Sequence, residues 1–483
     1  MEEIELKLDL SDAAAGALAA SDLLAGPAEA IDQTAVYFDT PDHALAAAGT
    51  SLRIRQSKGS RIQTVKQGNG AAAGLFARTE WEKPVDGDLP DLDDTPIPAL
   101  LGADAHDIAP VFTVNVTRRT WMLDDAGARI ELVIDRGTVH AADRFTPVSE
   151  CELELKSGPP AALFALARRL NAIAPVKLGV LSKSDRGYRL SGAAVMSHKA
   201  GPVALDDGMD AAQAFQAIVH SCIRQFRLNE DLILAIRAPE ALHQARVALR
   251  RLRSAFSIHR PMLGQDGAAL RADLRWLAGE MGQARDLDVL LERAIRGPYA
   301  DRIRRERESA YDHVQQVLNS ARARGLMLDL VDWLNGGDWL NDPQFYTLRG
   351  MPAREFASLA LSRYRRKVKK AGRGLTTMED EARHDLRKDA KKLRYASDFF
   401  TPLFSGGVRH KRFGKALADL QDQLGALNDL SAAPDILDRL GIQAGPDRDS
   451  LVPAGHKARS LKAAQGAYWK LAEAKRFWDK AGT

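Results

Sequence analysis

The sequence predicts an α+β protein of several domains, in which an eight-stranded antiparallel β tunnel or barrel precedes an all-α domain made of two similar helical bundles. Three observations carry this prediction. Charged and apolar residues alternate with period two through much of residues 1–190, whereas residues after about 208 show helical periodicity. A stretch rich in Gly, Ala, Pro and Ser lies between the two parts. Within the helical part, a basic motif occurs twice.

Three of the predicted strands carry an acidic or basic side chain at every second position. These positions are Glu3, Glu5 and Lys7 in the first strand, Arg53 and Arg55 in a later strand, and Glu150, Glu152, Glu154 and Lys156 in a third. Successive side chains of a strand point to opposite faces, so each of these strands has one charged and one apolar face. If the charged faces meet inside one barrel, its interior cannot be a dry core, because that much charge is too costly to bury. The pattern therefore favours a water-filled tunnel that holds metal ions and a compact polyanion.

The other elements of the first part follow in order. A helix is predicted at 11–24 after the first strand, and a second helix at 160–172. The further strands are predicted at 35–39, 51–56, 61–66, 76–82, 112–122, 128–135, 138–141 and 149–156. Together they give roughly eight strands, which suits a closed antiparallel barrel.

The second part is predicted to be helical throughout. Helices are expected at 213–235, 239–260, 268–295, 298–324, 354–371, 379–403, 409–429 and 456–477. The Gly- and Trp-containing stretch 330–350 divides them into two pseudo-repeats, at about 213–325 and 354–477. The predicted domain limits are 1–192 for the barrel, 193–207 for the linker and 208–480 for the helical domain.

The repeated motif places a histidine in a row of cations on one helix face. A sequence of the form His-x-x-Arg-x-x-x, two basic residues, Leu and Arg begins at His243 and again at His384. At 100° per residue, offsets of 3, 7 and 10 fall within about 80° of the histidine, so each motif forms one basic stripe. The two stripes consist of His243, Arg246, Arg250 and Arg253, and of His384, Arg387, Lys391 and Arg394.

The charge is distributed unevenly between the two parts. Residues 1–200 contain 21 Lys and Arg against 28 Asp and Glu, a net charge of −7, whereas residues 201–483 contain 47 against 36, a net charge of +11. The helical part should therefore prefer anionic partners. Nucleic acid is disfavoured as that partner, because the aromatic content of 6% offers little for base stacking and no groove-reading motif occurs.

The cellular location can also be predicted. The two cysteines, Cys151 and Cys222, fall in different domains and form neither a disulfide framework nor a metal-binding spacing. The amino terminus is acidic and enters a strand at once, and no stretch of eighteen apolar residues occurs. We therefore expect a cytoplasmic protein without membrane association. The sequence does not indicate an oligomeric state.

The charged strands contain the residue types that bind a metal ion and phosphates. Hard cations such as Mg²⁺ take carboxylate, water and phosphate oxygens as ligands. Lysine and arginine bind phosphate, and arginine does so with two parallel hydrogen bonds. The expected phosphate ligands are Lys7, Arg53, Arg55, Lys66 and one of Arg118 and Arg119. Metal and cations together neutralise phosphoryl oxygens, which is most of what phosphoryl transfer requires.

Residues 1 to about 192 resemble the CYTH family, the triphosphate tunnel metalloenzymes. The resemblance rests on Glu3-x-Glu5-x-Lys7, Tyr37-Phe38-Asp39-Thr40, Leu52-Arg53-Ile54-Arg55, Glu150-x-Glu152-x-Glu154 and Ser182-Lys183-x-x-Arg186-Gly187-Tyr188. It implies an eight-stranded tunnel, Mg²⁺ or Mn²⁺, and hydrolysis of a triphosphate. Members act on inorganic triphosphate, thiamine triphosphate, nucleoside triphosphates or RNA 5′-triphosphate ends, and a few are class IV adenylate cyclases. The motif does not say whether Lys156 reaches the tunnel.

Residues 206–480 resemble the CHAD domain, a histidine-containing helical domain often joined to CYTH. Its motif is the one repeated from His243 and His384. The resemblance implies that inorganic polyphosphate binds in a basic cavity between two pseudo-symmetric bundles. In the second repeat, lysines replace both adjacent arginines, which keeps the charge but loses bidentate geometry.

Together these observations predict an inorganic triphosphatase with a polyphosphate-binding helical domain. The expected metal ligands are Glu3, Glu5, Glu152 and Glu154, with Glu150 in reserve, and the expected phosphate ligands are Lys7, Arg53, Arg55, Lys66, Arg118 and Lys183. Asp135 is expected to position water or metal. The alternatives are a nucleoside or thiamine triphosphatase, an adenylate cyclase, or a non-catalytic scaffold that binds polyanions.

Overall fold

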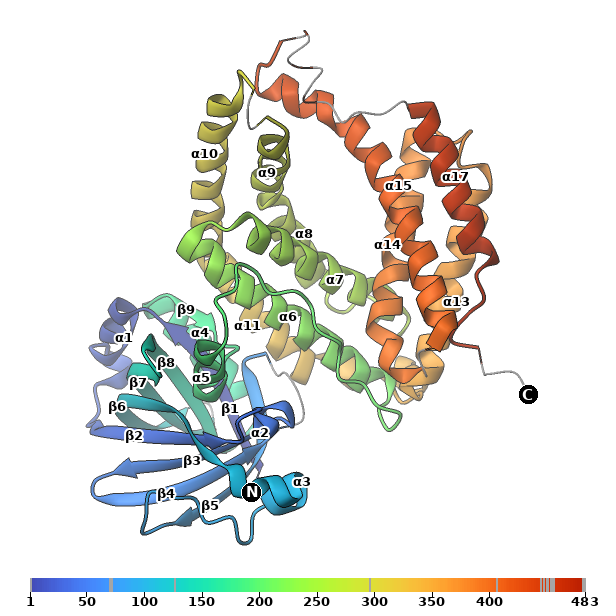
Figure 1. The fold of residues 1–483 in the computed structure, drawn as a ribbon. Helices are drawn as coiled ribbons and strands as arrows, with labels where there is room; N and C mark the ends of the chain where they lie inside the picture. The colour runs from blue at the N-terminus through green and yellow to red at the C-terminus, as the bar shows by residue number, and fades with distance from the viewer. Residues whose placement is uncertain are drawn as a thin grey trace. The chain divides into compact units, whose positions relative to one another are not determined.

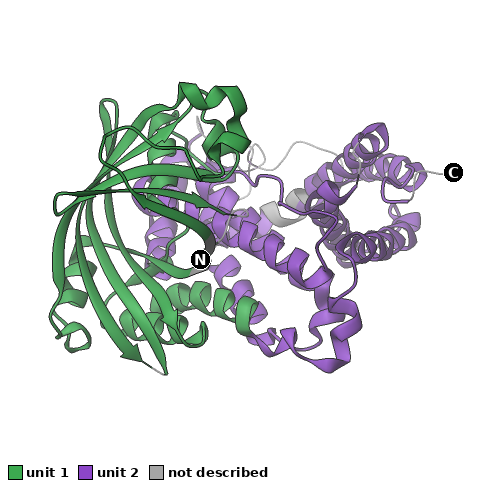
Figure 2. Ribbon diagram, turned by 90° about the horizontal axis from the view of Figure 1, so that it is seen from below, with its two compact units in different colours: residues 1–198, 318–336 green, residues 199–317, 337–483 purple. Residues whose placement is uncertain are grey.

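A computed structural model describes residues 2–68, 73–125, 127–294, 297–404, 407–443 and 457–479, together with residues 445, 448 and 451. The chain forms two compact units (Figure 2). The first comprises residues 1–198 and 318–336, and the second comprises residues 199–317 and 337–483. The first unit is therefore built from two separate stretches of the chain.

The first unit is an antiparallel β barrel (Figure 1). Its strands are β1 (Glu2–Leu10), β2 (Glu29–Asp39), β3 (Thr50–Ser57), β4 (Ser60–Gln67), β5 (Leu75–Pro84), β6 (Ala109–Asp125), β7 (Ala128–Ala141), β8 (Arg144–Ser157) and β9 (Val176–Leu178). They pair in the order β5-β4-β3-β2-β6-β7-β8-β1-β9, and β5 also pairs with β1. This extra pairing closes β1 to β8 into a ring, which confirms the predicted fold class.

The strand count differs slightly from the prediction. The described residues contain nine strands rather than about eight, because the short β9 pairs with the end of β1. The two strands predicted at 128–135 and 138–141 are one continuous strand, β7. Gly137 lies at the predicted break, where an added Cβ would lie 1.9 Å from the carbonyl oxygen of Asn115 on β6. This glycine therefore lets the two strands approach closely and does not end the strand.

Over much of the barrel, the apolar faces of the strands pack outward, beneath helices. The unit contains α1 (Asp12–Ala19), α2 (Ala44–Ala47), α3 (Ile97–Leu101), α4 (Ala161–Ile173) and α5 (Lys183–Ser191). Helices α1 and α4 pack on β1, β8 and β9, where Leu6, Leu8 and Leu153 are fully buried. On β2, β3 and β4, Phe38, Leu52 and Val65 form a core with Leu45 of α2 and Ile97 of α3. Because these faces are covered outside, the alternate charged positions face the interior.

Helix α11 (Ala321–Gly336) also belongs to the barrel unit, although the chain on either side of it belongs to the second unit. It packs on α4 and β9. Arg168 of α4 bonds Asp329 at 2.9 Å and Asp332 at 2.6 Å. Helical periodicity predicted one helix at 298–324, but Ser320 accepts a hydrogen bond from the backbone of Ala323 and starts a new helix there.

The second unit is helical, as predicted. Its helices are α6 (Ala211–Ile236), α7 (Pro239–Leu263), α8 (Ala268–Glu280), α9 (Gly282–Ala294), α10 (Ala300–Leu318), α12 (Tyr346–Arg349), α13 (Ala353–Ala371), α14 (Asp380–Phe400), α15 (Gly407–Arg439) and α17 (Lys457–Glu473). The helix predicted at 268–295 is divided at Met281, between Gly279 and Gly282, which weaken a helix interior. The repeated basic motifs lie on α7 and α14, which contact each other.

None of the helices in the described ranges combines the length and the apolar character that crossing a bilayer requires.

Candidate functional site

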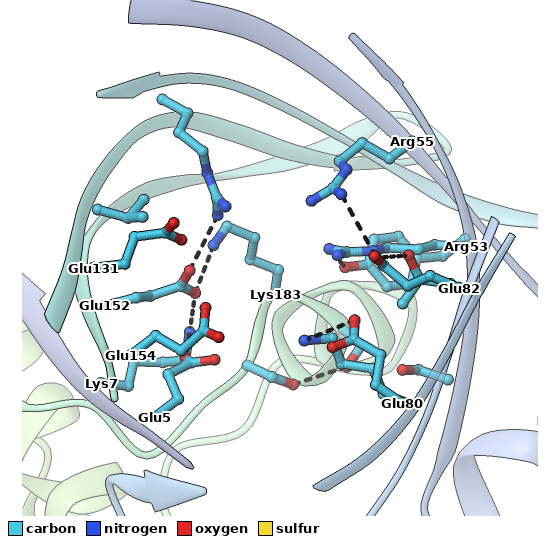
Figure 3. Close-up of a pocket in the computed structure, with 18 of the residues that line it drawn as sticks. Glu5, Lys7, Arg53, Arg55, Glu80, Glu82, Glu131, Glu152, Glu154 and Lys183 are labelled. Carbon is cyan, nitrogen blue, oxygen red and sulfur yellow. Dashed lines mark hydrogen bonds and ion pairs between the residues drawn. The ribbon is translucent and has the colours of Figure 1, made fainter. Parts of the chain in front are cut away.

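A cavity of about 290 Å³ lies inside the barrel (Figure 3). It is lined by Glu5, Lys7, Tyr37, Ser51, Arg53, Arg55, Thr64, Lys66, Glu80, Glu82, Arg118, Glu131, Val133, Glu152, Glu154, Lys156, Ser182, Lys183 and Ser184. Six of these side chains are carboxylates and seven are cationic. The volume is near the lower end of the ~300–1,000 Å³ that is typical of small-molecule sites.

The cavity has two walls of different composition (Figure 3). On one wall, β1, β7 and β8 present Glu5, Glu131, Glu152 and Glu154, and on the opposite wall β3 presents Arg53 and Arg55. Lys183, the first residue of α5, projects between the walls. Glu80 and Glu82 lie beside these arginines and Lys7 lies among the carboxylates of the first wall, so a ligand meets both signs of charge, with the two guanidinium groups on one side.

The deepest part of the carboxylate wall is a network of buried ion pairs. Nζ of Lys183 lies 2.7 Å from Asp135, 2.6 Å from Glu150 and 2.9 Å from Glu152. Lys7 bonds Glu152 and lies 3.3 Å from Glu150. These short contacts mean that the two lysines and the three carboxylates neutralise one another in a region with little solvent.

Arg118 completes this network from β6. Its guanidinium binds both carboxylate oxygens of Asp135, at 2.9 and 2.6 Å, and also reaches Glu152 at 3.0 Å. The neighbouring Arg119 instead lies over the ring of Trp121, at 4.9 Å from its centroid. Of the two adjacent arginines that the sequence offered, Arg118 is therefore the one in the cavity.

Burial and these ion pairs act in opposite directions on the pKa values of the network. Burial alone would raise the pKa of Glu152, but the charges of Lys183, Lys7 and Arg118 hold it well below its usual value. Burial would likewise lower the pKa of Lys183, yet Asp135, Glu150 and Glu152 raise it. Glu152 and Lys183 therefore stay charged at neutral pH, as phosphate and metal binding require.

The arginines on the opposite wall have longer contacts with their polar neighbours than Arg118 has in the network. Arg55 lies 3.6 Å from Glu82, and Lys66 lies 3.3 Å from Glu80. Arg53 contacts the hydroxyl of Tyr37 at 3.5 Å, and its buried Nε atom donates no hydrogen bond to the described residues. Burial and the charge of Arg53 lower the pKa of Arg55. Two adjacent guanidinium groups with so little compensation are suited to an anionic ligand.

The structure brings together most of the residues that the sequence singled out. Nine of them line the cavity, namely Glu5, Lys7, Arg53, Arg55, Lys66, Arg118, Glu152, Glu154 and Lys183. Asp135 and Glu150 are fully buried behind the lining and contact Lys183. The backbone of Glu3 lies in β1 opposite Arg78, and the side chain of Glu3 is outside the described residues. The role of each of these residues stays a prediction.

Four charged lining residues were not assigned from the sequence. Glu80 and Glu82 come from β5, Glu131 from β7, and Lys156 from the end of β8. The signal was the same period-two alternation, since Glu80 and Glu82 lie two residues apart and Glu131 lies four before Asp135. The structure also answers the question that the motif left open, because Lys156 reaches the cavity and lies 2.6 Å from Glu154.

The carboxylate wall fits a divalent metal ion. Asp135, Glu150 and Glu152 each offer an oxygen within 4.8 Å of the others, but all three are already paired with Lys7, Lys183 or Arg118. Glu5 and Glu154 lie on the cavity side of this cluster. The buried Oε1 of Glu5 accepts no hydrogen bond from the described residues, although Nζ of Lys7 is 3.0 Å away. Glu5 and Glu154 therefore present carboxylate oxygens, the ligand type that Mg²⁺ prefers, at the cavity next to the Asp135, Glu150 and Glu152 cluster.

The second unit contains a basic cavity of about 710 Å³ between α7, α8, α13 and α14. Six cations line it, namely Arg260, Arg271, Arg275, Arg363, Lys367 and Lys392, together with Ser257, Pro261, Ala268, Ala272 and Tyr364 and no carboxylate. Lys367 and Lys392 lie over the ring of Tyr364 at 5.5 and 6.0 Å. Lys392 is paired with Asp389 at 3.3 Å, and the excess of positive charge among the lining residues favours an anionic ligand.

The two predicted basic stripes are near this cavity but do not line it. On α7 the stripe His243, Arg246, Arg250 and Arg253 continues at helical spacing to Ser257 and Arg260 of the cavity. Burial and the charge of Arg275 lower the pKa of Arg253, which places the end of the stripe beside the cavity wall. The stripe His384, Arg387, Lys391 and Arg394 lies on α14, where the flanking Lys392 reaches the cavity.

Hydrogen bonds hold parts of both stripes against neighbouring helices. Arg246 donates to the carbonyl of Ala278 at 2.9 Å, and Arg394 donates to Gln421 at 3.2 Å. Burial, followed by the charges of Arg285, Arg250 and Arg246, lowers the pKa of His243 to about 4. His243 is therefore neutral at physiological pH as long as no anion is bound.

Models of two protein families match most of the chain. The CYTH domain matches residues 1–188, and the CHAD domain matches residues 217–438. The inorganic triphosphatase of Haemophilus influenzae is 31% identical over 161 residues, which are 32% of this chain and 44% of that protein. The chain thus spans less than half the length of that relative. An uncharacterised protein of Mycobacterium tuberculosis is 27% identical over 444 residues, or 82% of each chain.

Two solved structures resemble single parts of the chain. The CHAD domain of the plant Ricinus communis is 28% identical, with a TM-score of 0.49, and the match covers 59% of this chain and 99% of that one. A putative adenylyl cyclase from Hippeastrum, described as having a dominant triphosphatase activity, is 19% identical with a TM-score of 0.32, over 39% of this chain and 95% of that one.

Proposed function

We propose that this protein, which joins a CYTH domain to a CHAD domain, is an inorganic triphosphatase whose helical domain binds inorganic polyphosphate. The reaction is the hydrolysis of tripolyphosphate to diphosphate and phosphate, with Mg²⁺ or Mn²⁺. The similarity to the inorganic triphosphatase of Haemophilus influenzae, over 161 residues of this chain, supports the activity.

The composition of the cavity lining is the observation that carries the choice of substrate. Tyr37 is the single aromatic residue and Val133 the single aliphatic one among the side chains found to line it. A site for a nucleobase or a thiazolium ring would be lined mainly by apolar and aromatic groups. The charged lining therefore favours a bare phosphate chain over ATP or thiamine triphosphate.

The chain's own residues would bind and orient the substrate. A divalent ion held by Glu5, Glu152 and Glu154 would neutralise phosphoryl oxygens. Arg53 and Arg55 would bind the phosphate chain from the opposite wall, and Lys183 would bind it at the inner end of the cavity. Water attacks the terminal phosphorus in line, and the bond to the bridging oxygen breaks, which releases phosphate and diphosphate.

Asp135 has a different role in this proposal from the one that the sequence predicted. It is fully buried and binds Arg118 with both carboxylate oxygens. Contact with the attacking water would require it to give up these bonds. We infer that Asp135 orients Arg118 and Lys183, and that these two cations contact the phosphates.

A panel of phosphate-release assays tests the activity. The substrates are tripolyphosphate, ATP, thiamine triphosphate and long-chain polyphosphate, each with Mg²⁺ and with a chelator. We expect the highest kcat/KM for tripolyphosphate and no release in the chelator. A higher kcat/KM for ATP with cyclic AMP as product would identify a cyclase, and binding of polyanions without any hydrolysis would identify a scaffold.

Polyphosphate binding by the helical domain is supported by the six cations of its cavity and by the net charge of +11 on residues 201–483. Binding through many cations releases counterions, so the affinity should fall steeply with salt, as it does for nucleic acid. We expect binding by the full chain in the chelator, weakened when Arg271, Arg275 and Lys367 are replaced together by Gln. Duplex DNA at equal phosphate concentration is the control, and equal affinity for DNA would indicate a generic basic surface.

A further inference from the structure

Two motif residues that do not line the tunnel are hydrogen-bonded to each other. The hydroxyl of Tyr188 donates to Oδ2 of Asp39 at 2.7 Å. Asp39 ends β2, and Tyr188 lies on α5, about 150 residues later in the sequence. The proposed reaction assigns no role to either residue, because neither faces the cavity.

Asp39 is held rigidly at its end of this bond. It is buried, and its carboxylate accepts hydrogen bonds from the backbone nitrogens of Thr40, Leu45 and Ala46 at 2.8, 2.9 and 3.0 Å. These bonds satisfy the first turn of α2 and fix both carboxylate oxygens. The carboxylate of Asp39 is therefore a fixed acceptor, and a movement of α5 would break its hydrogen bond with Tyr188.

Helix α5 connects this hydrogen bond to the cavity, because it carries both Tyr188 and Lys183. Tyr188 is five residues after Lys183 on the same helix, a separation of ~7 Å along the axis. Between them, Gly187 packs so closely on β6 that an added Cβ would lie 2.3 Å from the ring of Phe112. The ring of Tyr188 also packs edge-on against Phe112, with centroids 5.1 Å apart. Helix α5 thus packs on β6 through Gly187 and Tyr188 and places Lys183, at its amino-terminal end, in the cavity.

We propose that Asp39 and Tyr188 form a latch that fixes α5, and that both are positioning residues for Lys183. The proposal rests on the tunnel being the triphosphatase site. Nζ of Lys183 contacts three carboxylates within 3 Å. A small shift of α5 would therefore change both these ion pairs and the contact of Lys183 with the phosphate chain.

A double-mutant cycle tests whether the latch acts through Lys183. Tyr188→Phe removes the hydroxyl and keeps the ring packed on Phe112. We expect it to lower kcat/KM for tripolyphosphate about tenfold, the effect on an equilibrium of losing one hydrogen bond to a charged acceptor. In a Lys183→Gln background the same change should have no further effect, because its target is gone. A purely structural role of Tyr188 would give the same loss in both backgrounds and would overturn the proposal.

A second measurement does not depend on activity. Amide hydrogen exchange of residues 183–191 should be about tenfold faster in Tyr188→Phe than in the wild type. Tyr468→Phe is the control, because it removes a comparable hydroxyl bond, to the carbonyl of Lys369, in the helical unit. Unchanged exchange in α5 would overturn the latch. If the wild type releases no phosphate, the proposed function fails and the exchange result alone decides about the latch.

Discussion

At the scale of single residues, the carboxylates of the tunnel differ in how deeply they are buried. The side chains of Glu150, Glu152 and Glu154 share one face of β8, but their exposed fractions are 0%, 14% and 25%. Period two predicts a shared face, yet it contains no information about depth along the strand. This is why the sequence predicted five metal ligands, whereas in the structure Glu150 is buried behind the lining and Glu5, Glu152 and Glu154 line the cavity.

Among the carboxylates that line the cavity, Glu5 gives the clearest prediction about activity. Glu5→Gln keeps the shape of the side chain but removes a charge from the proposed metal site. We expect kcat for tripolyphosphate to fall roughly 10²-fold, the scale on which one electrostatic contact to a transition state acts. Phosphate release at saturating Mg²⁺ measures this. Glu29→Gln, at an exposed ion pair with Lys58, is the matched control. Near wild-type turnover in Glu5→Gln would contradict the metal site.

The ion pairs of Asp135 lead to a prediction about the free energy of unfolding. Burial alone would raise its pKa, but Lys183 and Arg118 lower it below the usual value. A carboxylate whose pKa is lower in the folded state stabilises the fold above the unfolded pKa of about 4, and this contribution disappears as pH falls through the folded value. Asp135→Asn should therefore lower the free energy of unfolding by about 3 kcal/mol at pH 7, because it leaves buried cations uncompensated.

The pH dependence separates this effect from a simple loss of packing. The difference between wild type and Asp135→Asn should shrink below about pH 4, where the wild type also loses the ion pairs. Urea denaturation at pH 7 and at a pH below about 4 measures both values. A difference that stays constant with pH would show that Asp135 stabilises the barrel by something other than its charge.

At the scale of elements, local periodicity predicted strands and helices but not how distant segments pack. The barrel was predictable because each strand carries its own alternation, and the helical second part because its residues show helical periodicity. The placement of α11 was not predictable, since its contacts with α4 join residues about 160 positions apart. A fragment ending at residue 200 would lack α11 and leave its contact surface on α4 and β9 uncovered.

The α4–α11 contact offers a comparison between apolar burial and ion pairing. Leu330 is fully buried on α11, whereas Arg168 forms partly exposed ion pairs with Asp329 and Asp332. Leu330→Ala should destabilise the barrel unit by about 2–5 kcal/mol, and Arg168→Gln by less than about 1 kcal/mol. Calorimetric melting of the full chain measures both. Equal effects would mean that the ion pairs, and not the apolar surface, hold α11 on the barrel.

At the scale of the whole molecule, the two parts of the chain carry opposite net charge, and their two cavities have linings of different charge balance. In the barrel, seven cations are balanced by six carboxylates, so an anion there competes with internal ion pairs and benefits from an added metal ion. In the basic cavity of the helical unit no carboxylate was found among the lining residues. Binding of anions should therefore depend on metal in the barrel and on salt in the helical domain.

If polyphosphate binds along the α7 stripe, His243 should couple that binding to pH. Without ligand, burial and the charges of Arg285, Arg250 and Arg246 lower its pKa to about 4. A bound polyanion reverses that electrostatic environment and raises the pKa of His243, so binding takes up a proton. By linkage, affinity must then increase as pH falls between the bound and the free pKa, by up to about tenfold per pH unit.

Calorimetric titration of the full chain with polyphosphate tests this coupling. In a chelator that prevents hydrolysis, we expect tighter binding at pH 5 than at pH 7, and proton uptake that appears as a dependence of the binding heat on the ionisation enthalpy of the buffer. His243→Gln should remove a substantial part of both effects, whereas His106→Gln, at an exposed position in the barrel unit, should leave them unchanged. Identical proton uptake in His243→Gln and wild type would show that polyphosphate does not reach the α7 stripe, and would confine binding to the arginines and lysines of the cavity.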